Sequence, residues 1–108
     1  MFNNATKWTI FVGLNDGKTG KPIKQERVEQ AFSRLVDGIT ADFGGCTLVA
    51  ATGAWGNTRE DSVKIEIVTL KPNGEAWDSV HGAAVFIKNA LRQQEVYVTK
   101  ESIEFTAI

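Results

Sequence analysis

The stretch "CTLVAATGAWGNTREDSVKIEIVTL", residues 46–70, decides the fold because it holds two strand patterns separated by a turn. Its first part, residues 46–55, carries no charge and several small residues, which suits a strand better than a solvent-facing helix. Residues 62–70 alternate between apolar and polar side chains, as a half-buried strand does. The clearest alternation is Val63, Lys64, Ile65, Glu66 and Ile67. We expect a hairpin of two strands, with residues 57–61 as its solvated tip.

A helical pattern lies on each side of this hairpin. Before it, apolar residues at i, i+3, i+4, i+7 and i+11 predict a helix that Gly38 ends. This stripe consists of Val28, Ala31, Phe32, Leu35 and Ile39. After the turn formers "KPNG", residues 71–74, a second stripe at i, i+3, i+7, i+10 and i+14 predicts another helix. Its members are Trp77, Val80, Ala84, Ile87 and Leu91.

Strand patterns stand at both ends of the chain. Residues 7–14 alternate cleanly, and the C-terminal tail holds two alternating bursts that predict a fourth strand, broken by a bulge or turn near Lys100 and Glu101. The resulting order is that of the ferredoxin-like βαββαβ plait, an α+β fold whose four-stranded antiparallel sheet has two helices on one face. We expect a single domain over residues 1–108.

The other face of this sheet is predicted to be open to a partner, because strand parity places too many apolar residues on it for comfortable exposure. These positions are Thr9, Phe11, Thr47, Val49, Ala51, Lys64, Glu66 and Val68. Trp55 falls on the same side, at the hairpin end. A Trp near an Arg has the composition of binding hot spots. We therefore predict a ligand- or partner-binding site made of Trp55, Phe11, Arg59, Asn57 and Lys64.

Composition and charge argue against several classes of function. The 108 residues are 43% hydrophobic and 23% charged, as in an ordinary globular domain. A net charge of -1 and a pI of about 5.8 do not favour nucleic acid or an anionic membrane. The single Cys46 cannot form an intramolecular disulfide, and no apolar run approaches the roughly 18 residues that span a bilayer. We expect a cytoplasmic protein that does not enter membranes.

The sequence lacks a recognisable catalytic or metal-binding constellation. One His, one Cys and no spaced pair of carboxylates cannot supply the three or four ligands of a zinc site. His81 has Asp78 within helical reach, but a partly exposed place on the flank of a helix explains it as well. We interpret Cys46 as a small buried residue. No catalytic residue, metal or cofactor is predicted.

A basic loop precedes the first predicted helix. Lys18, Lys21 and Lys24, with Arg27 beyond them, stand near a helix N-terminus, which attracts anions. No Walker or dinucleotide-binding fingerprint accompanies them. The three lysines are candidate anion-binding residues, and an ordinary solvated loop is the alternative.

The string "IFVGLN", residues 10–15, resembles the first-strand motif of RNA recognition motifs, which stack bases on open-face aromatics. Phe11 is on the correct face for this role. The companion motif should supply two aromatics in a basic, Gly-rich context, and residues 61–70 supply none. RNA binding is therefore a further alternative only.

Two strands also resemble a family pattern. Phe11, Gly13 and Leu14 match a Y/F-x-G-L strand, and a second strand matches G-x-T-x-x-x-A-x-G-x-W at Gly45, Thr47, Ala51, Gly53 and Trp55. In these motifs the chain is similar to a family of small bacterial and bacteriophage proteins of unknown function. The resemblance implies the same fold over roughly the whole chain and brings no activity. A phage or mobile-element origin would fit a role against or within the host.

These observations support two main functions. The first is a non-enzymatic binding module, a homodimer, that uses the open sheet face and the Trp55 hairpin to bind a host protein or a small-molecule ligand. The alternative is a dimeric α/β-barrel enzyme, in which two sheets enclose a small apolar cavity that His81, Asp78 or Arg59 reach. A flat interface favours the first function and a defined pocket favours the second. The fourth strand would also suit exchange between subunits.

Overall fold

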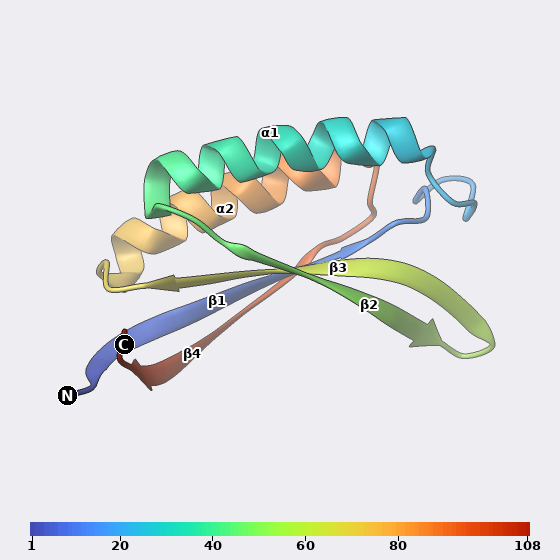
Figure 1. Ribbon diagram of the computed structural model, residues 1–108. Coiled ribbons are helices and arrows are strands. Elements are labelled where there is room, and N and C mark those ends of the chain that lie inside the picture. The colour runs from blue at the N-terminus through green and yellow to red at the C-terminus, as the bar shows by residue number, and fades with distance from the viewer.

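The computed structural model describes the backbone of residues 1–108 and every side chain except that of Trp55. Two helices cover one face of a four-stranded antiparallel sheet (Figure 1). The elements in chain order are β1 (Asn3–Gly13), α1 (Gln25–Phe43), β2 (Thr47–Trp55), β3 (Thr58–Thr69), α2 (Asn73–Ala90) and β4 (Tyr97–Phe105). In space the strands run β2-β3-β1-β4. The predicted ferredoxin-like plait is confirmed.

The core lies between the sheet and the helices. Ile10 and Val12 of β1 and Ile65 and Ile67 of β3 have no exposed surface. They pack with the buried residues of α1 and α2, which include the predicted stripe of Val28, Ala31, Phe32, Leu35 and Ile39. Each buried Ile, Val, Leu or Phe side chain among them contributes about 1.5–3 kcal/mol to the stability of the fold by leaving water. Neither helix that the structure describes is long and apolar enough to cross a membrane.

Both helix predictions were wrong in one detail. Gly38 lies inside α1, and Gly44 ends the helix with a left-handed φ of 86°, which glycine adopts without steric cost. In α2, Ala76 is fully buried, whereas Trp77 is 42% exposed and stacks at 5.9 Å on the buried Trp8. Ala76 takes the position in the buried stripe that the sequence assigned to Trp77. Trp77 instead covers the edge of the core.

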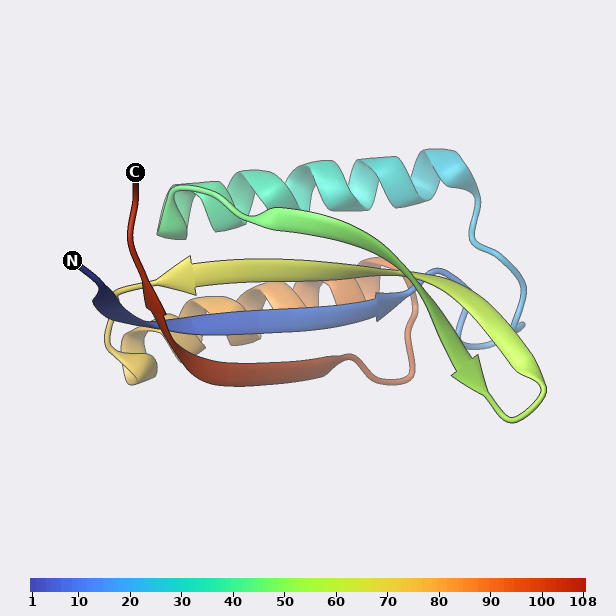
Figure 2. The same cartoon turned by 60° about the horizontal axis from the view of Figure 1, so that its bottom comes forward.

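β1 and β3 are also longer than predicted. β4 pairs with β1 without a break from Tyr97 to Phe105, so the predicted interruption near Lys100 is wrong. The hairpin turn contains only Gly56 and Asn57, and residues 58–61 belong to β3 instead of a solvated tip. Gly56 has a φ of 55°, which fits the first central position of a type II′ turn. The longer hairpin extends past the ends of both helices (Figure 2).

Candidate ligand-binding groove

The open face of the sheet is hollowed at the hairpin end. The groove has a volume of about 750 Å³, within the range of small-molecule sites. It lies between the end of β1 and the beginnings of β3 and β4, and the loops at residues 15–20 and 93–95 form its rim. This hollow gives the predicted open-face site a defined shape.

Two aromatic rings form part of its surface. Phe11 of β1 and Tyr97 of β4 are cross-strand partners, and they are 37% and 50% exposed. Both line the groove. The predicted location of Phe11 on the open face is therefore confirmed by its place in this lining. Exposed ring faces can stack on a planar ligand or attract a cation.

Gly13 of β1 leaves room for the carboxylate of Glu60, which is on the neighbouring strand β3. A side-chain Cβ at Gly13 would lie 2.6 Å from Oε2 of Glu60, so only glycine leaves Glu60 in its place. Glu60 Oε2 also accepts the backbone N–H of Asn15 at 2.9 Å. Among the described side chains no cation forms an ion pair with Glu60. The groove therefore holds a partly buried carboxylate whose charge is not compensated.

The charge of the lining is one-sided. Asp16, Glu60 and Glu95 line the groove, and the described lining residues include no Lys, Arg or His. Of these carboxylates, Asp16 has a cationic partner outside the lining, since its Oδ2 lies 3.4 Å from Nε of Arg92. Glu95 accepts a hydrogen bond from the Tyr97 hydroxyl at 3.1 Å, which raises the pKa of Tyr97. A phosphate would be repelled here, whereas a cation or a ligand rich in hydrogen-bond donors would be attracted.

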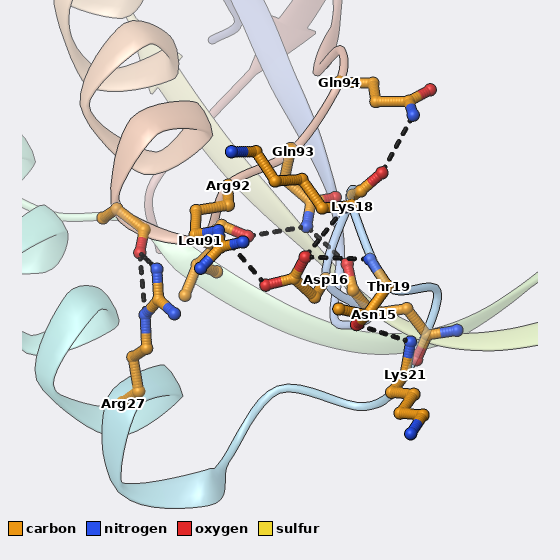
Figure 3. A network of polar contacts seen from close by, with 12 residues as sticks. Asn15, Asp16, Lys18, Thr19, Lys21, Arg27, Leu91, Arg92, Gln93 and Gln94 are labelled. Atoms are coloured by element: carbon orange, nitrogen blue, oxygen red, sulfur yellow. Dashed lines mark hydrogen bonds and ion pairs between the residues drawn. The ribbon is translucent and has the colours of Figure 1, made fainter.

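The rim loop at residues 15–20 is tied to the segment that leads into β4 (Figure 3). Gln93 Nε2 donates to the carbonyl of Asn15, and Gln94 Nε2 donates to the carbonyl of Gly17, each at 2.8 Å. The N–H of Gly17 donates to the carbonyl of Arg92 at 3.0 Å. Arg92 adopts a left-handed φ of 53°, which is uncommon outside glycine. These bonds arrange one wall of the groove before any ligand arrives.

The segment from this loop to α1 contains the predicted anion-binding lysines. Lys18, Lys21 and Lys24 are exposed. The carboxylate of Asp16 accepts the N–H groups of Lys18 and Thr19 at 2.8 and 3.2 Å, which lowers the pKa of Asp16. The backbone N–H groups of Lys18 and Thr19 are thus already bonded to an internal carboxylate. The anion site at the lysines stays a prediction.

The other predicted binding residues lie around the groove without lining it. Asn57 and Arg59 are exposed on the hairpin, and Lys64 pairs with Phe11 across β1 and β3. The side chain of Trp55 lies outside the described residues, so its predicted role stays a prediction. Of these residues, Lys64 pairs directly with a lining residue, Phe11.

The residues suggested for an enclosed enzyme cavity lie elsewhere. Asp78 and His81 are on α2, which covers the opposite face of the sheet, and the His81 ring lies tilted against the ring of Trp77, with the ring centroids 5.2 Å apart. Neither can reach the groove. Cys46 is partly buried against the core, and this burial raises the pKa of its thiol. In the described part of the chain, no three His, Cys, Asp or Glu residues are grouped as metal ligands.

Sequence reasoning missed Glu60, Asp16 and Tyr97 as site residues. Glu60 was assigned to the hairpin tip, yet it is two residues from Ser62 and therefore shares the open face once β3 is extended. Tyr97 required the register of β4 against β1. No local sequence pattern marks Glu60, because its pairing with Gly53 follows from the register of β2 against β3.

The opposite end of the open face is filled by ion pairs. Lys7 Nζ lies 3.1 Å from Oε2 of Glu66 and 3.7 Å from Oε1 of Glu101. The hydrogen bond and charge of Glu66 raise the pKa of Lys7. At this end each of the two carboxylates has Lys7 as a cationic partner.

No protein-family model and no curated protein matches the sequence. Similar folds occur among solved structures. A phage SAM lyase in complex with S-methyl-5′-thioadenosine is 19% identical, with a TM-score of 0.67 over 95% of this chain and 90% of that chain. Its apo state is 21% identical, with a TM-score of 0.68 over 96% and 90%. A dimeric ferredoxin-like protein of unknown function from Thermobifida fusca is 13% identical, with a TM-score of 0.51 over 92% of both chains. At these identities the likeness shows the fold.

Proposed function

We propose that the groove binds a sulfonium nucleoside of the S-adenosylmethionine type. The observation that carries the proposal is the uncompensated carboxylate of Glu60, in a hollow that also presents the rings of Phe11 and Tyr97. A sulfonium centre is a cation, which a carboxylate and aromatic faces attract. An adenine ring can stack on an exposed aromatic side chain. The ligand would thus match both the charge and the surface of the groove.

The fold likeness adds support of a different kind. Two of the similar structures are of a phage SAM lyase, and one of them contains S-methyl-5′-thioadenosine. The resemblance to small bacteriophage proteins that we predict from the sequence motifs would fit the same setting. Two glycines in those motifs, Gly13 and Gly53, line the groove. In this proposal the host component on which the protein acts is a small molecule.

Binding is the first candidate and bond cleavage the second. Release of S-methyl-5′-thioadenosine from S-adenosylmethionine breaks a carbon–sulfur bond. The electron pair goes to sulfur, which loses its positive charge, and the carbon that sulfur leaves forms a new bond to a nucleophile, either water or the ligand's own carboxylate. A carboxylate beside the sulfonium stabilises the charged starting state more than a transition state with less charge. Glu60 is therefore better suited to holding the ligand. Cleavage is favoured by the likeness of the fold to that of a lyase. Chromatography of the adenine-containing products would detect it.

Calorimetric titration with two nucleosides tests the proposal. S-adenosylmethionine carries the sulfonium charge, and S-methyl-5′-thioadenosine is the neutral thioether. Glu60→Gln removes the charge and keeps an oxygen that can accept the N–H of Asn15. Because a hydrogen bond or contact to a charged group contributes roughly 1.5–3 kcal/mol, we expect this variant to bind S-adenosylmethionine about tenfold to a hundredfold more weakly. Its affinity for the neutral nucleoside should change far less.

Glu101→Gln is the matched control, because Glu101 is an exposed carboxylate at the other end of the same face. It should leave both affinities unchanged. The proposal fails when the wild-type chain binds neither nucleoside, or when Glu60→Gln weakens both equally. In the latter case the carboxylate would act on the shared adenosine part.

A further inference from the structure

β2 combines an apolar sequence with exposure along its whole length. Residues 43–58 contain no charged side chain. Among residues 47–54, whose side chains the structure describes, none is buried, and Leu48 is 46% exposed. The side chains of apolar strands are normally buried against a second layer of structure. β2 is therefore unusual in having little of its surface covered by its own chain.

The two edges of the sheet differ in how they are protected. β4, at one edge, carries Lys100, Glu101 and Glu104. Charged side chains, prolines and bulges are the usual features that prevent an edge strand from pairing with another chain. β2, at the other edge, has no charge or proline, and it pairs with β3 residue by residue from Thr47 to Trp55. Its edge has none of these protections.

The hairpin turn determines which backbone groups of β2 point outward. In a two-residue turn the flanking pair, Trp55 and Thr58, is hydrogen-bonded. Pairs then alternate along an antiparallel ladder, so every second residue of β2 directs its N–H and C=O away from β3. These residues are Leu48, Ala50, Thr52 and Ala54. Within the described structure no backbone or side-chain group is bonded to them.

We propose that β2 pairs with β2 of a second copy of this chain, antiparallel and about a two-fold axis, to form one continuous eight-stranded sheet. Such an interface uses the same surface on both copies. A two-fold axis at Ala51 pairs Ala50 with Thr52 and Val49 with Gly53, and no charges meet. The same arrangement at β4 would place Glu101 opposite Glu101, where like charges destabilise pairing. Self-pairing is thus favoured at β2 alone.

This assembly leaves the groove open and does not depend on the proposed ligand. The added strand continues the sheet in its own plane beyond β2, whereas the groove opens on the face of the sheet. Loss of dimerisation with retained nucleoside binding, or the reverse, would therefore separate the two proposals. The interface also differs from the open-face contact that the sequence suggested for a homodimer.

Sedimentation velocity over a range of concentrations tests the assembly. The wild-type chain should sediment as a dimer at sub-millimolar concentration and dissociate on dilution. Thr52→Pro removes an outward N–H without touching the bonds to β3, and Thr52→Lys adds the charge that edge strands normally carry. Each should raise the dimer dissociation constant by about tenfold or more. Ser102→Lys, on the exposed edge strand β4, is the matched control and should leave it unchanged.

Hydrogen exchange supplies a second readout that does not need a variant. The amides of Leu48, Ala50, Thr52 and Ala54 should exchange slowly in the dimer and rapidly after dilution. A wild-type monomer at all concentrations would overturn the proposal. So would a dimer that persists in both Thr52 variants, because the contact would then lie elsewhere, such as on the open face.

Discussion

The two ends of the open sheet face are built from the same strands and differ in how their charges are matched. At one end Lys7 contacts both Glu66 and Glu101. At the other end Glu60 lies over Gly13 and has no cationic partner among the described side chains. A partly buried charge without a partner is unfavourable unless something else compensates it. The end with the unmatched carboxylate is therefore the end at which we propose that a ligand binds.

The largest expected effect is at the wall of the groove. In Gly17→Ala the new Cβ would overlap the carbonyl oxygen of Arg92 and lie 3.0 Å from the N of Gln94, both of them backbone atoms that cannot turn aside. We expect a loss of about 2 kcal/mol in the free energy of unfolding, measured by urea denaturation. Gly45→Ala is the control, because nothing lies within 4 Å of its Cβ. Equal stability of the two variants would mean that the wall is not rigid.

Gly13→Ala should affect binding more than stability. Its Cβ would meet the end of the Glu60 side chain, which can rotate away. We expect the free energy of unfolding to change by less than about 1 kcal/mol, while affinity for S-adenosylmethionine falls about tenfold because the carboxylate is displaced. Calorimetry and denaturation on the same sample separate the two. Unchanged affinity would show that the position of Glu60 is unimportant.

Acid should destabilise the groove end. The N–H of Lys18, with that of Thr19 and the charge of Arg92, holds the pKa of Asp16 below its usual value of 3.8. Because the folded state favours the carboxylate, the stability from Asp16 is present above pH 3.8 and is lost as the pH falls through the lowered pKa. Asp16→Asn should flatten the fall in melting temperature between roughly pH 5 and 2. A parallel fall in both proteins would contradict this.

The smallest effect is expected at the ion-paired end, and it has the opposite pH dependence. Glu66 raises the pKa of Lys7 above 10.5, so the stability from this ammonium is complete below that pH and is lost as the pH rises through the raised pKa. Lys7→Met should lose little stability against unfolding at neutral pH, since exposed ion pairs contribute weakly to stability and salt screens them. Its melting temperature should be less sensitive to alkali than that of the wild type. If the melting temperature of Lys7→Met were more sensitive to alkali than that of the wild type, the prediction for Lys7 would be wrong.

Some features of the site were open to prediction from the sequence and others were not. Phe11 was assigned to the open face by strand parity alone, since side chains alternate with a period of two. Glu60 was not, because the pattern of alternation weakens in residues 57–61 and only the observed pairing extends β3 through them. Trp77 shows the same limit on α2: its apolar side chain suggested the core, and the smaller Ala76 occupies that place.

The sequence by itself determined the order of the elements and the face that each one buries. Burial of one side of a helix or strand requires a fixed periodicity, and that requirement is written locally along the chain. Only the tertiary structure decided where the groove lies. Phe11, Gly13, Glu60 and Tyr97 come together through the register of three strands. Register joins residues far apart in the chain, so no local pattern records it.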